Sequence, residues 1–134
     1  MTSIKDQIEY WRESAGEDMK TARVLFDGKR YSGALFFGHI VLEKILKAFV
    51  VLETEKEAPK IHNLIRLHEL GNVGLDESTL KYIATVNAFN IRGRYEDYKK
   101  SFYQMCTKEY TVQNLNKIGE IYKMLCKKLE QGKL

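Results

Sequence analysis

The stretch SGALFFGHIVLEKILKAFVVLETE, residues 32–55, decides the fold of this chain. Apolar side chains occur on nearly every side of a helix drawn through it. Ser32 is a good N-cap at its start, and Pro59 lies shortly beyond its end and cannot continue a helix. Such a helix must be covered, either in the middle of a bundle or at a subunit interface. Because it also carries charged residues such as Glu43 and Lys47, we expect a buried helix and not a membrane span.

Helical periodicity continues on both sides of this segment. Apolar residues recur at three- and four-residue steps over about residues 4–27, which predicts a first helix ended by Gly28. Further helices are expected at about residues 63–70, at 76–90 with Asp76 or Ser78 as cap, and from a cap at Thr111 to about 131, with a short turn at 95–105. No segment alternates with period two, so no sheet is expected. The sequence predicts an all-α, up-and-down antiparallel four- to five-helix bundle, as a single domain over residues 1–134.

Composition limits the class of protein further. With 134 residues, the chain is long enough to bury a core without a metal or a disulfide. Its net charge of +4 permits an anionic partner without requiring one. Cys106 and Cys126 lie far apart and form no metal-type pair, which is typical of a reduced compartment. The N-terminus has no apolar signal core. We therefore expect a cytoplasmic protein with no membrane association, no metal and no cofactor.

The segment FNIRGRYEDYKK, residues 89–100, is the clearest candidate for function because it interrupts the helical pattern. Arg92 and Arg94 flank a glycine, and Tyr95 follows directly. Two interpretations remain open. The segment is either a solvated connection between two helices or a site for a phosphate group or a nucleic-acid backbone, with Arg92 or Arg94 providing the positive charge.

A polar row on the central helix is the second candidate. His39, Glu43 and Lys47 follow one another at steps of four, so they project from one face. In one interpretation Glu43 and Lys47 simply form an ion pair with His39 beside it. In the other, the row is the floor of a cleft, and Glu43 orients Arg92 or Arg94 through a bidentate pair. A metal site is not predicted, because no third ligand is evident.

Phe36 and the other two histidines are expected to have mainly structural roles. Phe36 is expected to be buried. His62, after Pro59, is expected to cap the following short helix, to pack in the turn or to touch the cleft. Arg66 and His68 are expected on a solvated face. Because His68 is six residues from His62, the two histidines do not share a helix face, and a two-histidine metal site is not expected there.

Several motifs occur in a fixed order along the chain. They are a first helix with aromatic and alanine residues, a turn at 28–36, the EKxxK pattern of Glu43, Lys44 and Lys47, the HxL at 62–64, and Arg94-Tyr95 followed by the acidic Asp97. In this order they resemble the HEPN domain family (higher eukaryotes and prokaryotes nucleotide-binding), in its branch of small stand-alone bacterial and archaeal proteins. The resemblance covers about residues 9–129.

The resemblance implies a helical bundle that is commonly a homodimer. Many members pair with a minimal nucleotidyltransferase as a toxin–antitoxin system. Catalytic members are metal-independent RNases whose motif is an arginine, a polar residue, three to five further residues and a histidine. This chain departs from that motif, because all three of its histidines precede Arg92 and Arg94. The usual acid–base group is missing at that place, so the RNase activity is not carried over.

The sequence therefore predicts a nucleotide- or anion-binding or interaction module without the usual RNase histidine. We expect a homodimer or higher homo-oligomer, a nucleotidyltransferase partner, and a nucleotide or RNA as ligand. The candidate binding residues are Arg92, Arg94, Glu43, Lys47, His39 and Tyr95. The alternative is a divergent metal-independent RNase or nucleotide-binding enzyme that uses Arg92 and Arg94 with Glu43 and Lys47.

Overall fold

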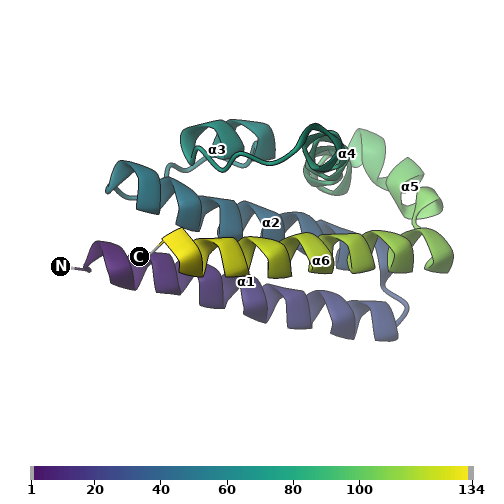
Figure 1. Cartoon of the computed structure of the whole chain (residues 1–134). Helices are drawn as coiled ribbons and strands as arrows, with labels where there is room; N and C mark the ends of the chain where they lie inside the picture. The colour runs from purple at the N-terminus through teal and green to yellow at the C-terminus, as the bar shows by residue number, and fades with distance from the viewer. Residues whose placement is uncertain (1, 133–134) are drawn as a thin grey trace.

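The computed structural model describes residues 2–132, and all the regular structure in that range is helical. Six helices follow one another (Figure 1): α1 (Ile4–Asp27), α2 (Tyr31–Thr54), α3 (Leu64–Leu70), α4 (Glu77–Arg94), α5 (Glu96–Met105) and α6 (Lys108–Gly132). The all-α prediction is confirmed, with one helix more than the expected four or five within these residues. No helix of residues 2–132 has the length and apolarity needed to cross a membrane.

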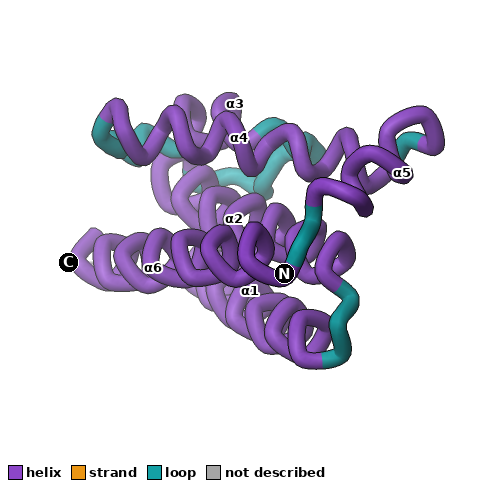
Figure 2. Tube along the Cα trace, turned by 90° about the vertical axis from the view of Figure 1, so that its right-hand side faces the viewer, coloured by secondary structure: helices purple, strands orange, loops and turns teal. Residues whose placement is uncertain are grey.

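The most apolar helix, α2, lies in the middle of the molecule. The long helices α1, α2 and α6 lie side by side, with α1 antiparallel to α2 (Figure 1). On the other side of α2 lie α3, α4 and α5. Helix α4 is seen along its axis in Figure 1 and lengthwise in Figure 2, so it crosses the long helices steeply. Because all five other helices pack against α2, its apolar surface is covered within the chain.

The ends of the first two helices show which local signals are used. Helix α1 has the predicted bounds: Ser3 Oγ accepts a hydrogen bond from the Asp6 amide (3.0 Å), and Gly28 follows the last turn. The predicted cap at Ser32 is wrong, because α2 already begins at Tyr31. Arg30 takes the N-cap position, and its side chain makes no capping hydrogen bond. The first turn of α2 therefore lacks a side-chain acceptor.

The segment around Arg92 is helical, contrary to the prediction of a break there. Helix α4 continues to Arg94, and the interruption is confined to Tyr95, which ends α4 and precedes α5. Gly93 does not end the helix because it serves packing: a Cβ at this position would lie 2.8 Å from Phe36 Cδ1. The glycine lets α4 approach α2 closely.

The last helix also begins earlier than predicted. Helix α6 starts at Lys108, and Thr107 Oγ1 accepts a hydrogen bond from the Tyr110 amide (3.2 Å). The predicted cap, Thr111, is fully buried inside the helix and cannot mark its solvated end. The short α3 is capped by Asn63, whose Oδ1 accepts from the amides of Ile65 and Arg66, and not by His62.

Candidate functional site

The two candidate arginines lie in the last turn of α4 with their side chains exposed. Arg94 Nε donates to Asn90 Oδ1 (3.1 Å), and its guanidinium lies 5.8 Å from the ring centroid of Phe36, within cation–π range. Arg92 Nη1 lies 3.2 Å from Met105 Sδ, a weak acceptor. Neither arginine takes part in an ion pair with another residue of the range 2–132. Their charges are therefore free for an anionic ligand.

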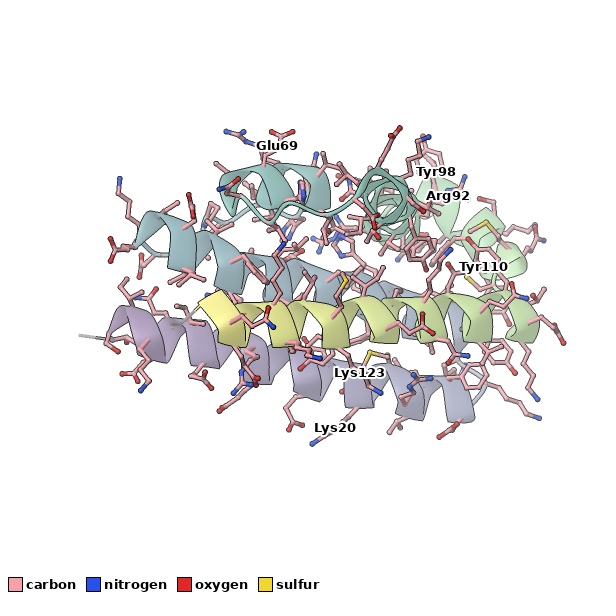
Figure 3. All side chains as sticks on the ribbon, viewed as in Figure 1. Lys20, Glu69, Arg92, Tyr98, Tyr110 and Lys123 are labelled. Atoms are coloured by element: carbon pink, nitrogen blue, oxygen red, sulfur yellow. The ribbon has the colours of Figure 1, made fainter. Side chains whose placement is uncertain are left out.

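Three exposed tyrosines follow these arginines along the chain. Tyr95 lies at the junction of α4 and α5, and Tyr98 and Tyr103 follow on α5, with Tyr103 as much as 72% exposed. Arg92 and Tyr98 lie at the same corner of the molecule (Figure 3). Lone exposed apolar residues are common, but several aromatic rings among cations form a surface of the kind that stacks bases or binds a partner.

The polar row of α2 exists as predicted, but it is buried. The side chain of His39 is completely buried, and that of Lys47 is 8% exposed. Lys47 Nζ donates to Glu43 Oε2 (3.1 Å) and lies 5.2 Å from the ring centroid of Trp11. The row is therefore part of the interior and not the open floor of a cleft at the arginines.

His62, from the connection between α2 and α3, completes this row. Its Nδ1 lies 2.9 Å from Glu43 Oε1, and its backbone oxygen lies 3.2 Å from His39 Nε2. Both oxygens of Glu43 are thus engaged by Lys47 and His62, and neither Arg92 nor Arg94 pairs with it. The His62 side chain is 49% exposed, so its ring contacts the buried carboxylate of Glu43 on one side and the solvent on the other.

The buried imidazole of His39 is neutral at physiological pH. Burial lowers the pKa of His39 to about 4, and the charge of Arg94 acts in the same direction, whereas Glu43 opposes them. Arg94 therefore lies within electrostatic reach of the row. If Nε2 donates to the His62 oxygen, Nδ1 is an acceptor, and it has no hydrogen-bond partner within residues 2–132.

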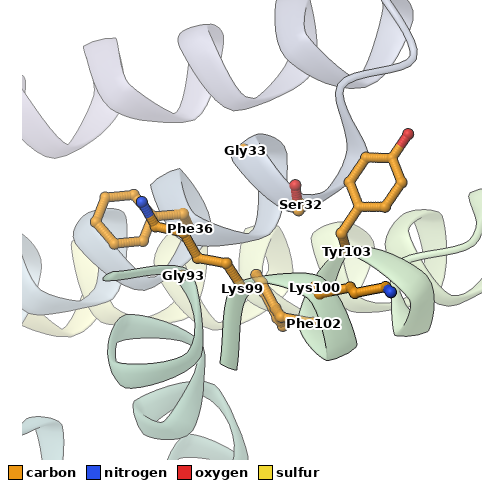
Figure 4. A pocket seen from close by; sticks show the side chains of 8 residues that line it. All are labelled: Ser32, Gly33, Phe36, Gly93, Lys99, Lys100, Phe102 and Tyr103. Carbon is orange, nitrogen blue, oxygen red and sulfur yellow. The ribbon is translucent and has the colours of Figure 1, made fainter. Parts of the chain in front are cut away.

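A cavity of about 620 Å³, here called the α5 cavity, opens at Gly93, the residue between the two arginines (Figure 4). Phe36 and Lys99 lie on one side of it, and Ser32 and Tyr103 on the other. Its complete lining comes from the start of α2, the end of α4 and one face of α5: Ser32, Gly33, Phe36, Gly93, Lys99, Lys100, Phe102 and Tyr103. Phe36 was predicted to be buried, but it is only partly so, because it forms a wall of this cavity.

The α5 cavity combines apolar walls with cations and no acidic lining residue. Lys99 Nζ forms a surface ion pair with Glu96 Oε1 (3.2 Å), whereas no carboxylate of the described chain pairs with Lys100. Such a lining suits a ligand with a flat apolar part and an anionic group, since the rings supply contact area and the ammonium groups supply charge.

The cysteines and the metal-ligating side chains of residues 2–132 give no further site. Within residues 2–132 no group of three or more His, Cys, Asp or Glu residues could hold a metal ion. Both cysteines are free, and burial raises the pKa of Cys106 to about 11 and that of Cys126 in the same direction, so both thiols stay protonated near neutral pH. His68 is not on a solvated face as predicted: its Nε2 accepts a hydrogen bond from the Leu75 amide (3.0 Å).

The predicted site residues thus separate into two places. The α4–α5 corner holds Arg92, Arg94 and Tyr95. The buried face of α2 holds His39, Glu43 and Lys47. For His62 the sequence left a cap, turn packing and the cleft open and did not predict its contact with Glu43. It also did not predict that Lys99, Lys100 and Phe102 line a cavity. No periodic pattern marks His62, since it lies in an irregular connection, but the lysines could have been found from the amphipathic character of residues 96–105.

Comparison with known proteins gives one family. The model of the family described as HEPN domain matches residues 8–129, nearly the whole chain. Neither a search of curated proteins nor a search of solved structures gave a significant match.

Proposed function

This chain belongs to the HEPN domain family, and on that premise we propose that it is a nucleotide- or anion-binding module with its phosphate site at the α4–α5 corner. The observation that carries the proposal is the pair of exposed guanidiniums of Arg92 and Arg94, uncompensated by any carboxylate of residues 2–132, beside the α5 cavity. Guanidinium groups match the geometry of phosphate oxygens and bind them through two donors at once.

The cavity supports the nucleotide form of this proposal. A base would lie against Phe36 and Tyr103, while the phosphate reaches Lys100 in the lining and Arg94, whose guanidinium lies 5.8 Å from the centroid of the Phe36 ring. Stacking on aromatic rings and contact with cations each contribute, and together they favour a phosphorylated nucleoside over either part alone. Tyr95 is exposed at the same corner and is an additional surface for a second base.

A titration with AMP, adenosine and inorganic phosphate tests this function. We expect AMP to bind more tightly than either fragment, and affinity to fall as salt rises, because the contact is ionic. The double variant Arg92→Ala/Arg94→Ala should lose at least about tenfold in affinity. Arg66→Ala is the matched control, since Arg66 is also exposed but lies on α3, paired with Glu69 at 3.2 Å. Equal binding of adenosine and AMP, or unchanged affinity in the double variant, contradicts the proposal.

Family membership also supports a protein partner. The module pairs with a minimal nucleotidyltransferase of the toxin–antitoxin type and forms a homodimer or higher homo-oligomer. The exposed Ile91, Tyr98 and Tyr103 offer apolar surface for such contacts, whereas α2 does not, because it is covered within the chain. Light scattering of the purified protein tests the oligomer, and co-purification with the product of an adjacent nucleotidyltransferase gene tests the partner. A monomer that retains no such protein contradicts both.

A second candidate function, a divergent metal-independent RNase, is favoured by one observation. Glu43 holds the half-exposed imidazole of His62 beside His39, whose pKa the charge of Arg94 helps to lower. A histidine that is oriented by a carboxylate is a common general base in enzymes. In this reaction His62 would take the proton of a ribose 2′-hydroxyl. The 2′-oxygen would then bond to phosphorus while the bond from phosphorus to the 5′-oxygen breaks, giving a cyclic phosphate. The leaving 5′-oxygen would take a proton from water, and the protonated His62 would return its proton to the solvent.

Cleavage of an RNA oligonucleotide in the presence of a chelator tests this second function. Cleavage should be lost in His62→Gln and reduced in Glu43→Gln, but kept in His68→Gln, because His68 lies outside the buried row. A wild-type protein that cleaves no more than a blank, while still binding AMP, eliminates the RNase and leaves the binding module.

A further inference from the structure

A second cavity of about 830 Å³, here called the α1 cavity, lies at the opposite end of α2 from the α5 cavity. In Figure 1 this is the end where α1 begins and α6 ends. Its lining comes from the residue before the N-cap of α1, from the first turns of α1, from Lys47 on α2 and from the connection after α2: Thr2, Gln7, Tyr10, Trp11, Lys47, Glu57, Ala58, Pro59 and Lys60. None of these residues lines the α5 cavity.

The feature that distinguishes this cavity is the ammonium group of Lys47. The Lys47 side chain is 8% exposed, and within residues 2–132 its ammonium makes one hydrogen bond, to Glu43 Oε2, an oxygen of the carboxylate that also holds His62. An ammonium has three donors, and burial of a charge is costly unless its donors find acceptors. Lys44, three positions earlier, has two close oxygens, from Asp18 and Ser14, each at 2.7 Å. Lys47 has room for another acceptor, and it lines the cavity.

The walls above Lys47 suit a flat ring. The indole of Trp11 lies 5.2 Å from Lys47 Nζ, and the ring of Tyr10 meets it edge-on with the centroids 5.2 Å apart. Ala58 and Pro59 supply apolar surface from the connection. Aromatic rings pack well in offset or edge-to-face arrangements, so a planar ligand gains contact here.

We propose that the α1 cavity binds a small aryl carboxylate, with its carboxylate on Lys47 and its ring against Trp11. The charges around the cavity favour a single negative charge. The lining holds Lys47, Lys60 and Glu57, a net charge of +1, which a single carboxylate balances and a phosphate dianion exceeds. Glu43, behind the lining, already pairs with Lys47, and it raises the cost of a second negative charge. This site is separate from the phosphate site at the α4–α5 corner, and it stands without that function.

Nuclear magnetic resonance provides a direct test, because Trp11 is the only tryptophan and its indole N–H gives one resolved signal. Benzoate is the probe, benzamide is its uncharged analogue, and phenyl phosphate is the dianionic analogue. We expect benzoate to shift the indole signal and the amides of residues 57–60 in a saturable way. Benzamide and phenyl phosphate should bind at least about tenfold more weakly, because benzamide lacks the charge and phenyl phosphate exceeds it.

Variants separate this site from nonspecific binding. The double variant Glu43→Gln/Lys47→Met removes both buried charges together, so that it keeps its fold, and it should lose the benzoate shifts. Lys44→Met removes a cation from the same helix that does not line the cavity, and it should keep them. The proposal is overturned by the absence of a saturable shift in the wild type, by equal or tighter binding of benzamide or phenyl phosphate, or by benzoate shifts that persist in the double variant.

Discussion

His62 Nδ1 lies 2.9 Å from Glu43 Oε1, so a residue of the α2–α3 connection and a carboxylate of the central helix form a pair across 19 positions of sequence. The second oxygen of the same carboxylate binds Lys47. A buried carboxylate is costly unless its oxygens are hydrogen-bonded. The pair with His62 therefore stabilises the buried charge of Glu43, and it also holds the connection after α2 against that helix.

Removal of Lys47 alone should be more damaging than removal of the pair. Lys47→Met leaves Glu43 with His62 as its one hydrogen-bond partner among residues 2–132, and breaking a buried pair typically costs about 3–5 kcal/mol of unfolding free energy. The double variant Glu43→Gln/Lys47→Met leaves no buried charge and should be less destabilised. Urea unfolding of both variants measures the difference. A double variant at least as unstable as the single one contradicts this account.

Stability should fall in mild acid because of His39. The pKa of a histidine is about 6.5 in the unfolded chain, and burial lowers that of folded His39 to about 4. Between these values the unfolded chain binds a proton that the folded chain does not. The contribution of His39 is therefore complete above pH 6.5 and is lost as the pH falls to about 4, by up to about 3 kcal/mol.

Urea unfolding at a series of pH values checks this dependence. His39→Gln removes the titrating group, so its unfolding free energy should change less between pH 6.5 and 4 than that of the wild type, whatever its stability at neutral pH. Parallel curves for the two proteins would show that other groups cause the loss.

The sequence predicts the helices well where the apolar pattern is long, and less well where packing decides. The bounds of α1 follow from its stripe, with Ile8, Ala15 and Ala22 buried as the spacing requires. In contrast, Gly93 suggests a break only until its contact with Phe36 is known, and that contact joins residues 57 positions apart. Local propensity contains no information on such a contact, because tertiary packing overrides it.

The site shows the same division. The spacing of His39, Glu43 and Lys47 correctly places them on one face of α2. It cannot show that the face is buried or that His62 closes it, since both depend on where the irregular connection returns to the helix. Whether Arg92, Arg94 and Tyr95 bind an anion stays a prediction for the titrations described above.

Two phenylalanines at the α5 cavity should differ in their effect on stability. Phe102 is almost fully buried and packs against Phe89 with ring centroids 5.6 Å apart, so Phe102→Ala should cost about 3–5 kcal/mol. Phe36 is only partly buried and should cost less on truncation, although it forms a wall of the same cavity. Thermal and urea unfolding of the two variants give the comparison, and an equal or larger loss for Phe36→Ala would show that it belongs to the core.

Arg94→Ala separates a binding role from a structural one. The side chain is exposed, and its contacts with Asn90 and Phe36 are weak, so stability should change by no more than about 0.5 kcal/mol. AMP affinity should nevertheless fall, because a phosphate ligand would lose a charged donor. Melting curves and titrations on the same sample decide the matter. A loss of several degrees in Tm with unchanged AMP affinity would identify Arg94 as a clamp between α4 and α2.

Gly93→Ala should close the α5 cavity from inside. The new Cβ would lie 2.8 Å from Phe36 Cδ1, so the ring must turn away, and the free space beside it is the cavity that both residues line. Alanine favours the helix by up to about 1 kcal/mol relative to glycine, which partly offsets about 1–3 kcal/mol of strain. We therefore expect a small loss of stability together with a clear loss of AMP affinity.

The control for this substitution is Gly119→Ala in α6. There a Cβ would lie 3.3 Å from Arg23 Nη2, the end of a flexible side chain that can move, and the residue does not line the α5 cavity. Stability should change little, and AMP affinity should be that of the wild type. If Gly93→Ala also keeps full AMP affinity while Phe36 is displaced, the nucleotide does not occupy the α5 cavity, and the phosphate site must be confined to the exposed arginines.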